Sequence, residues 1–325
     1  MKRRLRMVAG ALAGCLLLAG CGLSAGASAP LHVKPAGIQP VPELAGVEIT
    51  VGSKDFSEQL VLAYLAELAL SAAGADVRDL SNIAGSNSGR DALLSGQIDL
   101  MWEYTGTAWI SYLGHEEPIP DELAQFKAVA EEDLKRNGVV WSAMAPLNNT
   151  YAFAMSKANA ERLGVKTVSD IARLVQERPQ EATFCLESEF ASRNDGMPGL
   201  QQRYGFEAPA GGIKLLGIGP IYQAVANGDT CNFGEVFTTD GRILAQNLVL
   251  VEDDKSFFPR YNASLTMRKE TADRYPQITR VLEPISKKLT NDVVLKLNAQ
   301  VDVDGKDPAE VARDWLVAEG LVNPA

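Results

Sequence analysis

The chain has 325 residues, of which 46% are hydrophobic, and its 41 acidic against 31 basic side chains give a formal charge of −10. Such an acidic surface argues against nucleic acid as a partner, because phosphate backbones are bound by basic faces. The length is sufficient for two ordinary domains, even after the N-terminal segment is set aside.

The N-terminus has the order of an export signal. Several Lys and Arg residues precede an apolar run over residues 7–20, which is too short and too rich in Ala and Gly for a good membrane-spanning helix. The run ends in Leu-Ala-Gly-Cys at residues 18–21, which is a bacterial lipobox. We therefore predict a signal peptide over residues 1–20 and a lipid anchor on Cys21, which would hold the protein outside the cytoplasm at the membrane.

Two other interpretations of this segment stay open. Residues 12–15 repeat the Leu-Ala-Gly-Cys form, but cleavage there would leave a very short apolar core, so Cys15 is interpreted as a bystander. An ordinary signal peptide cleaved near Ala27 or Ala29 would instead release a free soluble protein. In either case we predict a flexible tether over residues 21–45, because most of that stretch is rich in Ala, Ser, Pro and Gly without an apolar period.

Cys185 and Cys231 are the cysteines that remain once the N-terminal pair is set aside, and an exported protein can oxidise them. We predict a disulfide between them, whose closed loop would contribute roughly 3 to 4 kcal/mol to stability. Two buried free thiols are the alternative. No other Cys and no His cluster offers metal ligands, so we expect neither a metal nor a cofactor.

The first strong elements are a strand over residues 47–51 and an apolar helix over residues 59–73. Asp55 and Glu58, just before that helix, have the spacing of a capping box. A strand, a short loop and a helix are the usual opening of an α/β domain. Ligands bind beyond the carboxyl ends of the strands in such sheets, so the loop at residues 52–56 is expected to lie beside a ligand.

Residues 90–107 and 221–239 share one pattern, in which a helix is followed by Gly, a short strand, Glu, an aromatic residue and Thr. The pattern suggests two lobes of similar construction, each of which presents an aromatic ring at the end of a strand. Its specificity is low, because a helix, a glycine and a strand follow one another in many α/β proteins.

The other predicted elements indicate one lobe inserted into another. We predict strands over 139–141, 151–155, 248–251 and 262–267, and helices over 276–289, 292–300 and 308–319. The helical return at the C-terminus fits two lobes joined by two crossovers, near Asn148 and near Arg260. We therefore assign residues 46–148 and 261–325 to lobe I and residues 149–260 to lobe II.

Few residues in this sequence are candidates for catalysis. The histidines are His32, in the predicted tether, and His115, in a polar loop, and no nucleophile elbow, phosphate loop or HExxH motif is present. We expect a protein that is not an enzyme. A surface enzyme acting on a choline ester, with His115 as its base, is the remote alternative.

Aromatic residues are better candidates, for the binding of an organic cation. Tyr104, Tyr151, Phe237 and Tyr261 all fall at predicted strand ends or crossovers. Several aromatic faces around one pocket can hold a cation that has no hydrogen-bond donors, at roughly 0.5 to 2 kcal/mol per ring. Taken singly, each ring has core packing as its commoner role.

A family resemblance combines these signals. The motifs that carry it are GSKDFSEQ at 52–59, GQID at 96–99, EYTGT at 103–107, NNTY at 148–151, RNDG at 193–196, TDGR at 239–242, FFP at 257–259 and VDVDGK at 301–306. In their order and spacing they resemble the substrate-binding lipoproteins of osmoprotectant ABC transporters, the glycine betaine/carnitine/choline-binding type. The resemblance extends from about residue 47 to residue 321.

The resemblance implies a fold and a set of site residues. The fold is the α/β, two-lobed periplasmic-binding-protein type II architecture, which closes on its ligand by hinge motion. The implied site comprises an aromatic cage of Tyr104, Tyr151, Phe237 and Tyr261, a carboxylate-binding set of Lys54, Thr107 and Arg193, and Asn149 lining the pocket. Phe237 departs from the family's usual tyrosine and lacks its hydroxyl.

The implied function is an extracytoplasmic solute-binding protein that delivers a quaternary-ammonium osmoprotectant to an ABC transporter permease with its ATPase. We expect a monomer that prefers glycine betaine, because Lys54 and Arg193 would pair with its carboxylate and choline has none. Choline, carnitine and other compatible solutes are the alternatives. If Lys54 and Arg193 form only a surface ion pair, or if the fold is kept only as an interaction surface, the preference disappears.

Overall fold

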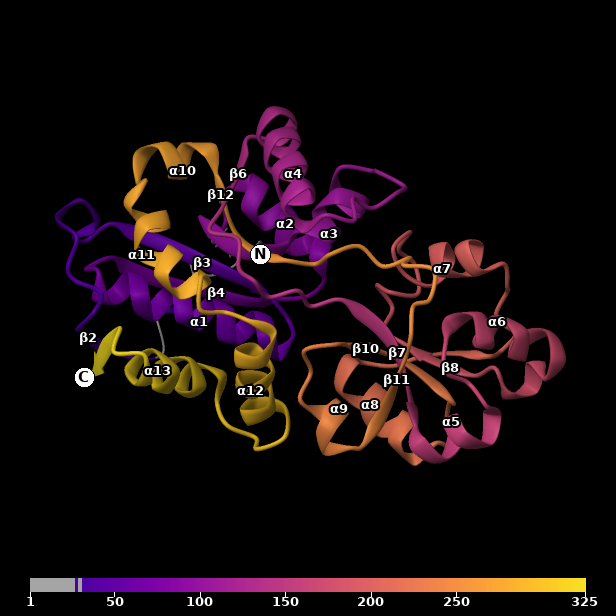
Figure 1. Cartoon of the computed structure of the whole chain (residues 1–325). Helices are drawn as coiled ribbons and strands as arrows, with labels where there is room; N and C mark the ends of the chain where they lie inside the picture. Colours follow the sequence, from indigo (N-terminus) through magenta and orange to yellow (C-terminus); the bar gives the residue numbers. More distant parts are fainter. Residues whose placement is uncertain (1–26, 29–30) are drawn as a thin grey trace, which may run out of the picture.

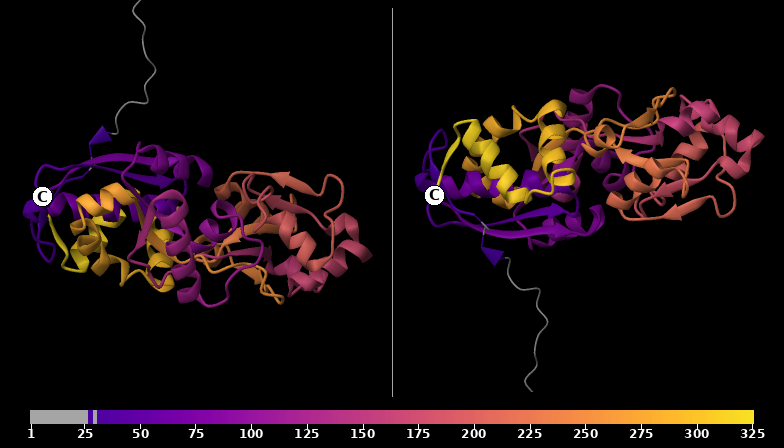
Figure 2. Two further views of the ribbon diagram at one scale, coloured as in Figure 1. Left: turned by 90° about the horizontal axis from the view of Figure 1, so that it is seen from above. Right: turned by 90° about the horizontal axis from the view of Figure 1, so that it is seen from below.

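The computed structural model describes residues 27–28 and 31–325, so the predicted signal peptide and Cys21 lie outside the described residues. Two β-sheets with helices packed on them form two lobes that lie side by side (Figure 1). Views from above and below show an elongated molecule, in which the first and last parts of the chain share one lobe and the middle of the chain forms the other (Figure 2). No described helix is long and apolar enough to cross a membrane.

Lobe I contains a six-stranded mixed sheet. Its strands, in spatial order, are β1 (Ala27–Ser28), β4 (Asp76–Ile83), β3 (Glu48–Lys54), β5 (Leu100–Tyr104), β12 (Ala263–Arg268) and β6 (Val139–Ser142). β3 runs parallel to β4 and β5, whereas β12 runs antiparallel to β5 and β6. Because β3 and β5 are parallel neighbours, they end at the same edge of the sheet, at Lys54 and Tyr104.

α1 (Ser57–Ala72) is the central helix of lobe I. Its side chains are buried around most of its circumference, because the sheet covers one side and the C-terminal helices cover the other. Those helices are α11 (Gln277–Ser286), α12 (Asn291–Asp302) and α13 (Pro308–Ala318). Along β5, Leu100 and Trp102 pack on the α1 side and Met101 packs on the other, with α2 (Ser86–Ser95) and α4 (Glu122–Asn137). Short helices α3 (Thr105–Thr107), η2 (Ala108–Tyr112) and α10 (Lys269–Arg274) complete the lobe.

Lobe II contains a five-stranded sheet between two apolar clusters. Its strands, in spatial order, are β11 (Leu248–Val251), β7 (Tyr151–Ser156), β10 (Phe233–Phe237), β8 (Phe184–Leu186) and β9 (Ile213–Leu215). Its helices are α5 (Lys157–Leu163), α6 (Val168–Glu177), η3 (Pro179–Glu181), α7 (Met197–Tyr204), α8 (Ile218–Asn227) and α9 (Arg242–Ala245). The disulfide between Cys185 and Cys231 is present, with 5.8 Å between the Cα atoms, and ties β8 to the turn before β10. The predicted pairing is confirmed.

The chain crosses between the lobes twice, after β6 and after β11. The two crossovers lie side by side, because Asn148 in the first pairs with Asn262 in the second as an antiparallel bridge. The two predicted crossovers are thus confirmed, while the residue numbers that we assign to the lobe boundaries stay a prediction. The two similar units are also present: Gly96 ends α2 before β5 and Gly228 ends α8 before β10, both at left-handed φ values of 80° and 72°.

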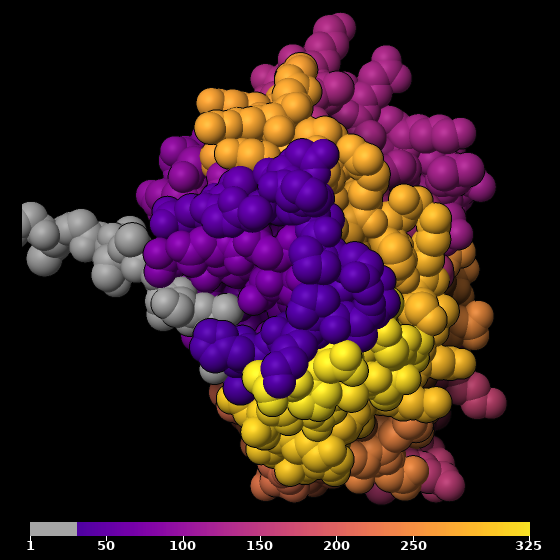
Figure 3. Space-filling view, turned by 90° about the vertical axis from the view of Figure 1, so that its left-hand side faces the viewer, coloured from indigo at the N-terminus to yellow at the C-terminus, as the bar shows by residue number. Residues whose placement is uncertain are grey.

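The predicted tether is wrong in its second half. Within residues 31–45, β2 (Val33–Pro35) pairs with the C-terminal strand β13 (Val322–Pro324), and η1 (Pro42–Leu44) places Leu44 fully buried in the core of lobe I. Figure 3 shows the N-terminal and C-terminal segments against each other on this face. The apolar residues of this stretch are unevenly spaced, because they fill gaps on an existing surface rather than forming one face of a helix or strand.

Candidate ligand-binding site

A cavity of about 760 Å³ lies between the two lobes. All eight residues predicted from the sequence for the aromatic cage, the carboxylate-binding set and the pocket lining are brought together in its wall: Lys54, Tyr104, Thr107, Asn149, Tyr151, Arg193, Phe237 and Tyr261. Its size falls within the range of about 300 to 1,000 Å³ that is usual for small-molecule sites. The arrangement supports the predicted site, whose ligand-binding role remains a proposal.

The carboxyl ends of strands position most of the lobe I side chains. Lys54 is the last residue of β3 and Tyr104 the last of β5, and Thr107 follows directly in α3. Gly106, between them, allows the second crossover to approach, because a Cβ atom there would lie only 2.7 Å from the Tyr261 ring and 2.8 Å from the Arg260 carbonyl oxygen. The glycine therefore lets Tyr261 pack closely against α3.

Five aromatic rings form a continuous wall of the cavity. Tyr151 lies 5.2 Å from Phe237 and 5.3 Å from Tyr261 between ring centroids, with the Tyr261 ring edge-on. Phe56 stacks on Phe237 at 5.1 Å and on Tyr104 at 6.3 Å, and so joins the four predicted rings into one group. Phe56 lies within the GSKDFSEQ motif but is not among the residues predicted for the cage. Its position directly after a strand was the signal that could have identified it.

Two of the three tyrosine hydroxyls of the cage donate to buried carboxylates. The Tyr104 hydroxyl donates to Glu58 at 2.7 Å and the Tyr261 hydroxyl donates to Asp195 at 2.7 Å. Burial, with the neighbouring acid as the next cause, raises the pKa of both tyrosines well above the usual value. The rings therefore stay neutral and keep the negative potential on their faces that attracts a cation.

Glu58 has a different role from the predicted one. The N-terminus of α1 has no side-chain cap, so the capping-box prediction for Asp55 and Glu58 is wrong. Glu58 is instead buried beneath the cavity, where its carboxylate accepts hydrogen bonds from both lobes: Tyr104, Asn149, Thr239 and Asn298 donate at 2.7, 2.9, 2.6 and 3.0 Å. Burial raises its pKa, and the four hydrogen bonds oppose that shift.

Lys54 and Arg193, predicted to receive a ligand carboxylate, already have acidic partners. The Lys54 ammonium lies 2.6 Å from Glu103. The Arg193 guanidinium binds Asp195 on one side and Glu189 on the other, at 2.6 Å from Glu189, and also reaches the Thr107 hydroxyl at 3.4 Å. Neither cation is free to attract an anion without a change of partner.

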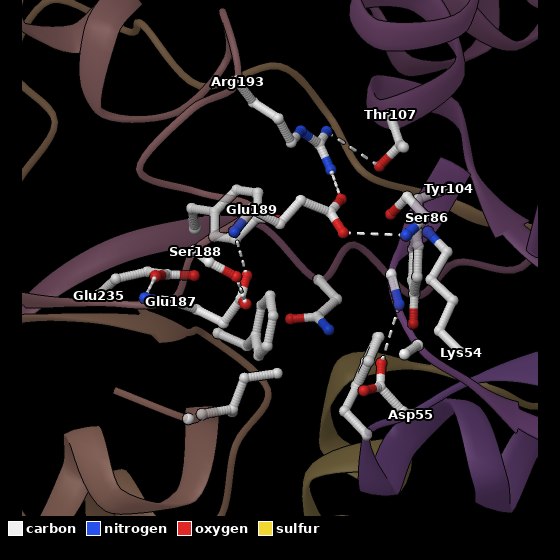
Figure 4. Close-up of a pocket in the computed structure, with 18 of the residues that line it drawn as sticks. Lys54, Asp55, Ser86, Tyr104, Thr107, Glu187, Ser188, Glu189, Arg193 and Glu235 are labelled. Carbon is white, nitrogen blue, oxygen red and sulfur yellow. Dashed lines mark hydrogen bonds and ion pairs between the residues drawn. The ribbon is translucent and has the colours of Figure 1, made fainter. Parts of the chain in front are cut away.

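Glu189 extends from lobe II into the middle of the cavity (Figure 4). One carboxylate oxygen pairs with Arg193, and the other accepts a hydrogen bond of 2.9 Å from the backbone N–H of Ser86 at the N-terminus of α2. Burial would raise the pKa of Glu189, but the charges of Lys54 and Arg193 and the Ser86 hydrogen bond lower it to about 2. Glu189 is therefore an ionised carboxylate that bridges the two lobes.

A second pair of acids lines the lobe II side of the cavity. Glu235, in the middle of β10, accepts a hydrogen bond of 2.8 Å from the backbone N–H of Glu187, which directly follows β8. Burial is the main cause that raises the pKa of Glu235 to about 8, and the Glu187 charge adds to the shift. Together with Asp55 and Glu189, these acids outnumber the two cations in the wall.

The residues considered for other chemistry lie elsewhere. His115 does not line the cavity; its ring stacks on Trp109 at 3.5 Å and its Nε2 atom lies 2.8 Å from Glu132. The choline-esterase alternative thus loses its proposed base. Within residues 27–28 and 31–325 no group of three His, Cys, Asp or Glu side chains could hold a metal ion.

Comparison with known proteins places the chain in a family. Residues 47–318 match the family model described as the substrate binding domain of ABC-type glycine betaine transport systems. The chain is 37% identical over 281 residues to a glycine-betaine-binding protein of Pseudomonas aeruginosa, covering 85% of this chain and 89% of that one. It is 32% identical over 274 residues to an ergothioneine transport permease/ergothioneine binding protein of Helicobacter pylori, covering 84% of this chain and 48% of that longer protein.

A solved structure agrees with these sequence relatives. A crystal structure described as a glycine betaine/carnitine/choline ABC transporter has a TM-score of 0.66 and 26% identity, covering 83% of this chain and 98% of that chain. The resemblance and the type II periplasmic-binding-protein fold predicted from the sequence are both confirmed. The family consists of extracytoplasmic binding proteins that supply ABC importers, not of enzymes, as expected. The chain belongs to the family of substrate-binding domains of ABC-type glycine betaine transport systems.

Proposed function

We propose that this protein captures glycine betaine outside the cytoplasm, as a lipoprotein anchored through Cys21, and delivers it to an ABC permease with its ATPase. The observation that carries the proposal is the wall of aromatic rings, to which Tyr104, Tyr151, Phe237 and Tyr261 contribute, in a cavity between two lobes. The glycine-betaine-binding relative from Pseudomonas aeruginosa supports the same ligand.

The trimethylammonium group would lie against the rings. It has no hydrogen-bond donor, so polar side chains offer it little, whereas each ring face contributes roughly 0.5 to 2 kcal/mol. Phe237 suits this role without a hydroxyl, because its ring packs between Phe56 and Tyr151 and presents only its face and edge.

The carboxylate would bind toward Thr107, Arg193 and Lys54, as predicted, by replacing an internal carboxylate. Of the three acids that pair with the two cations, Glu189 has 27% of its side chain exposed, against 3% for Glu103 and 1% for Asp195. Glu189 is therefore the partner that can leave with the least loss of buried contacts. A ligand in this position contacts both lobes and would favour their closed arrangement.

The rest of the proposal concerns assembly. The lipidated Cys21 would hold the binding domain near the permease. We propose that the protein acts as a monomer, in keeping with a cavity that two lobes of one chain complete.

Calorimetric titration of glycine betaine into the wild-type protein and into Tyr151→Ala and Tyr151→Phe tests the function. Tyr151 contacts two other cage rings, and no hydrogen bond from its hydroxyl is found among the described residues, so its ring can be tested separately from its hydroxyl. We expect Tyr151→Ala to weaken binding about tenfold and Tyr151→Phe to remain near wild type. A wild-type protein that binds neither glycine betaine nor choline nor carnitine would refute the proposal.

A further inference from the structure

Each lobe carries a glutamate in its equivalent strand, Glu103 in β5 and Glu235 in β10, but the two glutamates have different partners. In lobe I, Glu103 on β5 receives the ammonium of Lys54 from the neighbouring strand β3 at 2.6 Å and the hydroxyl of Tyr112 at 2.8 Å. In lobe II, Glu235 on β10 has β8 as its parallel neighbour, and the residue that follows β8 is Glu187. The segment that leaves the neighbouring strand therefore brings an acid, and not a lysine, beside Glu235.

Glu235 has one carboxylate oxygen without a partner. Oε2 accepts the backbone N–H of Glu187, but no hydrogen bond to Oε1 and no cation within ion-pair distance is found among residues 27–28 and 31–325. The residue is 4% exposed and lines the cavity. Oε1 is not among the fully buried side-chain atoms that lack a partner, so it is open to the cavity and can accept a hydrogen bond from a molecule there.

Glu187 does not supply that partner. Its own carboxylate oxygens accept from the Ser188 hydroxyl at 2.5 Å and from the backbone N–H of Glu189 at 2.6 Å. Arg193, the nearest cationic group named above, is engaged by Glu189 and Asp195. The open oxygen of Glu235 is therefore directed to whatever fills the cavity (Figure 4).

We propose that Glu235, supported by Glu187, forms a second subsite that accepts an N–H or O–H donor from the far end of the ligand. This inference rests on the proposed function, in which the quaternary ammonium occupies the cage. The ligand class would be quaternary-ammonium compounds larger than glycine betaine, such as betaines that carry a heteroaromatic N–H. A cavity of about 760 Å³ has room for such a group beyond the cage.

The charge state of Glu235 suits this role. Burial and the charge of Glu187 raise the pKa of Glu235 to about 8, although the Glu187 backbone hydrogen bond and Arg193 oppose the shift. Near neutral pH the carboxyl can hold a proton when the cavity contains water and can lose it when a ligand N–H approaches. Glu103 differs from Glu235 in having a cationic partner, because the Lys54 ammonium lies 2.6 Å from its carboxylate.

The test uses two synthetic ligands of nearly equal size: Nα-trimethylhistidine, whose ring carries an N–H donor, and Nα-trimethylphenylalanine, whose ring carries none. Glycine betaine is the third ligand. Each is titrated calorimetrically into the wild-type protein, into Glu235→Gln and into Glu207→Gln, an exposed acid of lobe II that serves as the matched control.

We expect the wild type to bind trimethylhistidine at least about tenfold more tightly than trimethylphenylalanine, as sites with a buried polar group do. Glu235→Gln should reduce that preference to about threefold or less and leave glycine betaine affinity within about twofold, because a neutral amide makes a weaker hydrogen bond than a carboxylate. Glu207→Gln should behave as wild type. Should Glu235→Gln lower the melting temperature markedly, Glu187→Gln should show the same reduced preference.

Equal wild-type affinity for the two aromatic ligands, or an equal loss for all three ligands in Glu235→Gln, would overturn the second subsite and leave the proposed function intact, since glycine betaine would still bind. Absence of binding of every quaternary-ammonium compound to the wild type would overturn the proposed function and the subsite together.

Discussion

At the scale of single residues, the proposed binding of a zwitterion depends on Glu189. Its carboxylate occupies the position between Arg193 and the Ser86 N–H that a ligand carboxylate would also favour. In the proposed binding mode, a glycine betaine molecule would replace the carboxylate of Glu189 by its own, whereas choline would leave Glu189 in place. The preference for betaine over choline that we predict from Lys54 and Arg193 depends on this exchange.

Replacement of Glu189 by Gln should strengthen glycine betaine binding. The amide oxygen can still accept from Ser86, but the negative charge that competes for Arg193 is gone, so we expect affinity for glycine betaine to rise about three- to tenfold and affinity for choline to stay level or fall. Calorimetric titration of both ligands measures the two affinities, with Glu177→Gln on the exposed face of α6 as the control. A loss of glycine betaine affinity would mean that Glu189 helps to hold Arg193 for the ligand.

The same residues show what a sequence can reveal about a site. Tyr104, Tyr151, Phe237 and Tyr261 could be named because they fall at predicted strand ends or crossovers and because the family resemblance implies an aromatic cage at these positions. The pairing of Lys54 could not be predicted, because its partner Glu103 lies on another strand and only the fold brings the two within 3 Å. The partners of Arg193, Glu189 and Asp195, lie within four residues of it, but no pattern in the sequence showed that they would pair with it.

At the scale of elements, α1 carries a second buried acid besides Glu58. Unlike Glu58, this acid has no hydrogen-bond partner in the part of the chain that the structure describes. Glu67 is fully buried, and neither of its carboxylate oxygens has a hydrogen-bond partner among the described residues. Burial first, and then the charge of Asp79, raises the pKa of Glu67 from 4.5 to about 9. The folded protein therefore binds a proton here that the unfolded chain releases above about pH 4.5.

This proton makes stability depend on pH in a defined direction. Because the folded-state pKa is raised, the contribution of Glu67 is complete below about pH 4.5 and is lost as the pH rises toward 9. We expect the free energy of unfolding of Glu67→Gln to decline less between pH 5 and pH 9 than that of the wild type. Urea denaturation at several pH values measures it, with exposed Glu131→Gln as the control. Parallel pH profiles for all three proteins would contradict the assignment.

Strands and helices could be predicted from the sequence where their apolar residues recur with a regular period. The strands at 139–141, 151–155, 248–251 and 262–267 and the three C-terminal helices all occur close to their predicted ends. The stretch at residues 31–45 was misjudged, because its burial comes from pairing with the C-terminus, which no local pattern records. The capping-box prediction for Asp55 and Glu58 failed for a related reason. The Glu58 carboxylate accepts hydrogen bonds from residues far away in the sequence instead of capping the helix.

At the scale of the whole molecule, hydrogen bonds and an ion pair join the two lobes beneath the cavity. Thr239, in lobe II, donates its hydroxyl to Glu58 of lobe I at 2.6 Å and accepts through its carbonyl from Asn298 of α12 at 3.0 Å. Nearby, Arg242 lies 3.6 Å from Asp302. Because Glu58 also holds the Tyr104 hydroxyl, the approach of the lobes and the position of a cage ring are coupled through one carboxylate.

Removal of the Thr239 hydroxyl should therefore weaken binding from outside the cavity, since Thr239 does not line it. The Thr239→Val substitution keeps the shape of the side chain but removes the hydrogen bond between the lobes. It should therefore lower the fraction of molecules in the binding-competent arrangement, and the apparent Kd should rise in proportion. Loss of one charge-assisted hydrogen bond corresponds to about tenfold in glycine betaine affinity. Thr239→Ser, which keeps the hydroxyl, should bind as wild type, and small-angle scattering should show ligand-induced compaction reduced in Thr239→Val alone. Unchanged affinity with unchanged compaction would show that the lobes close without this contact.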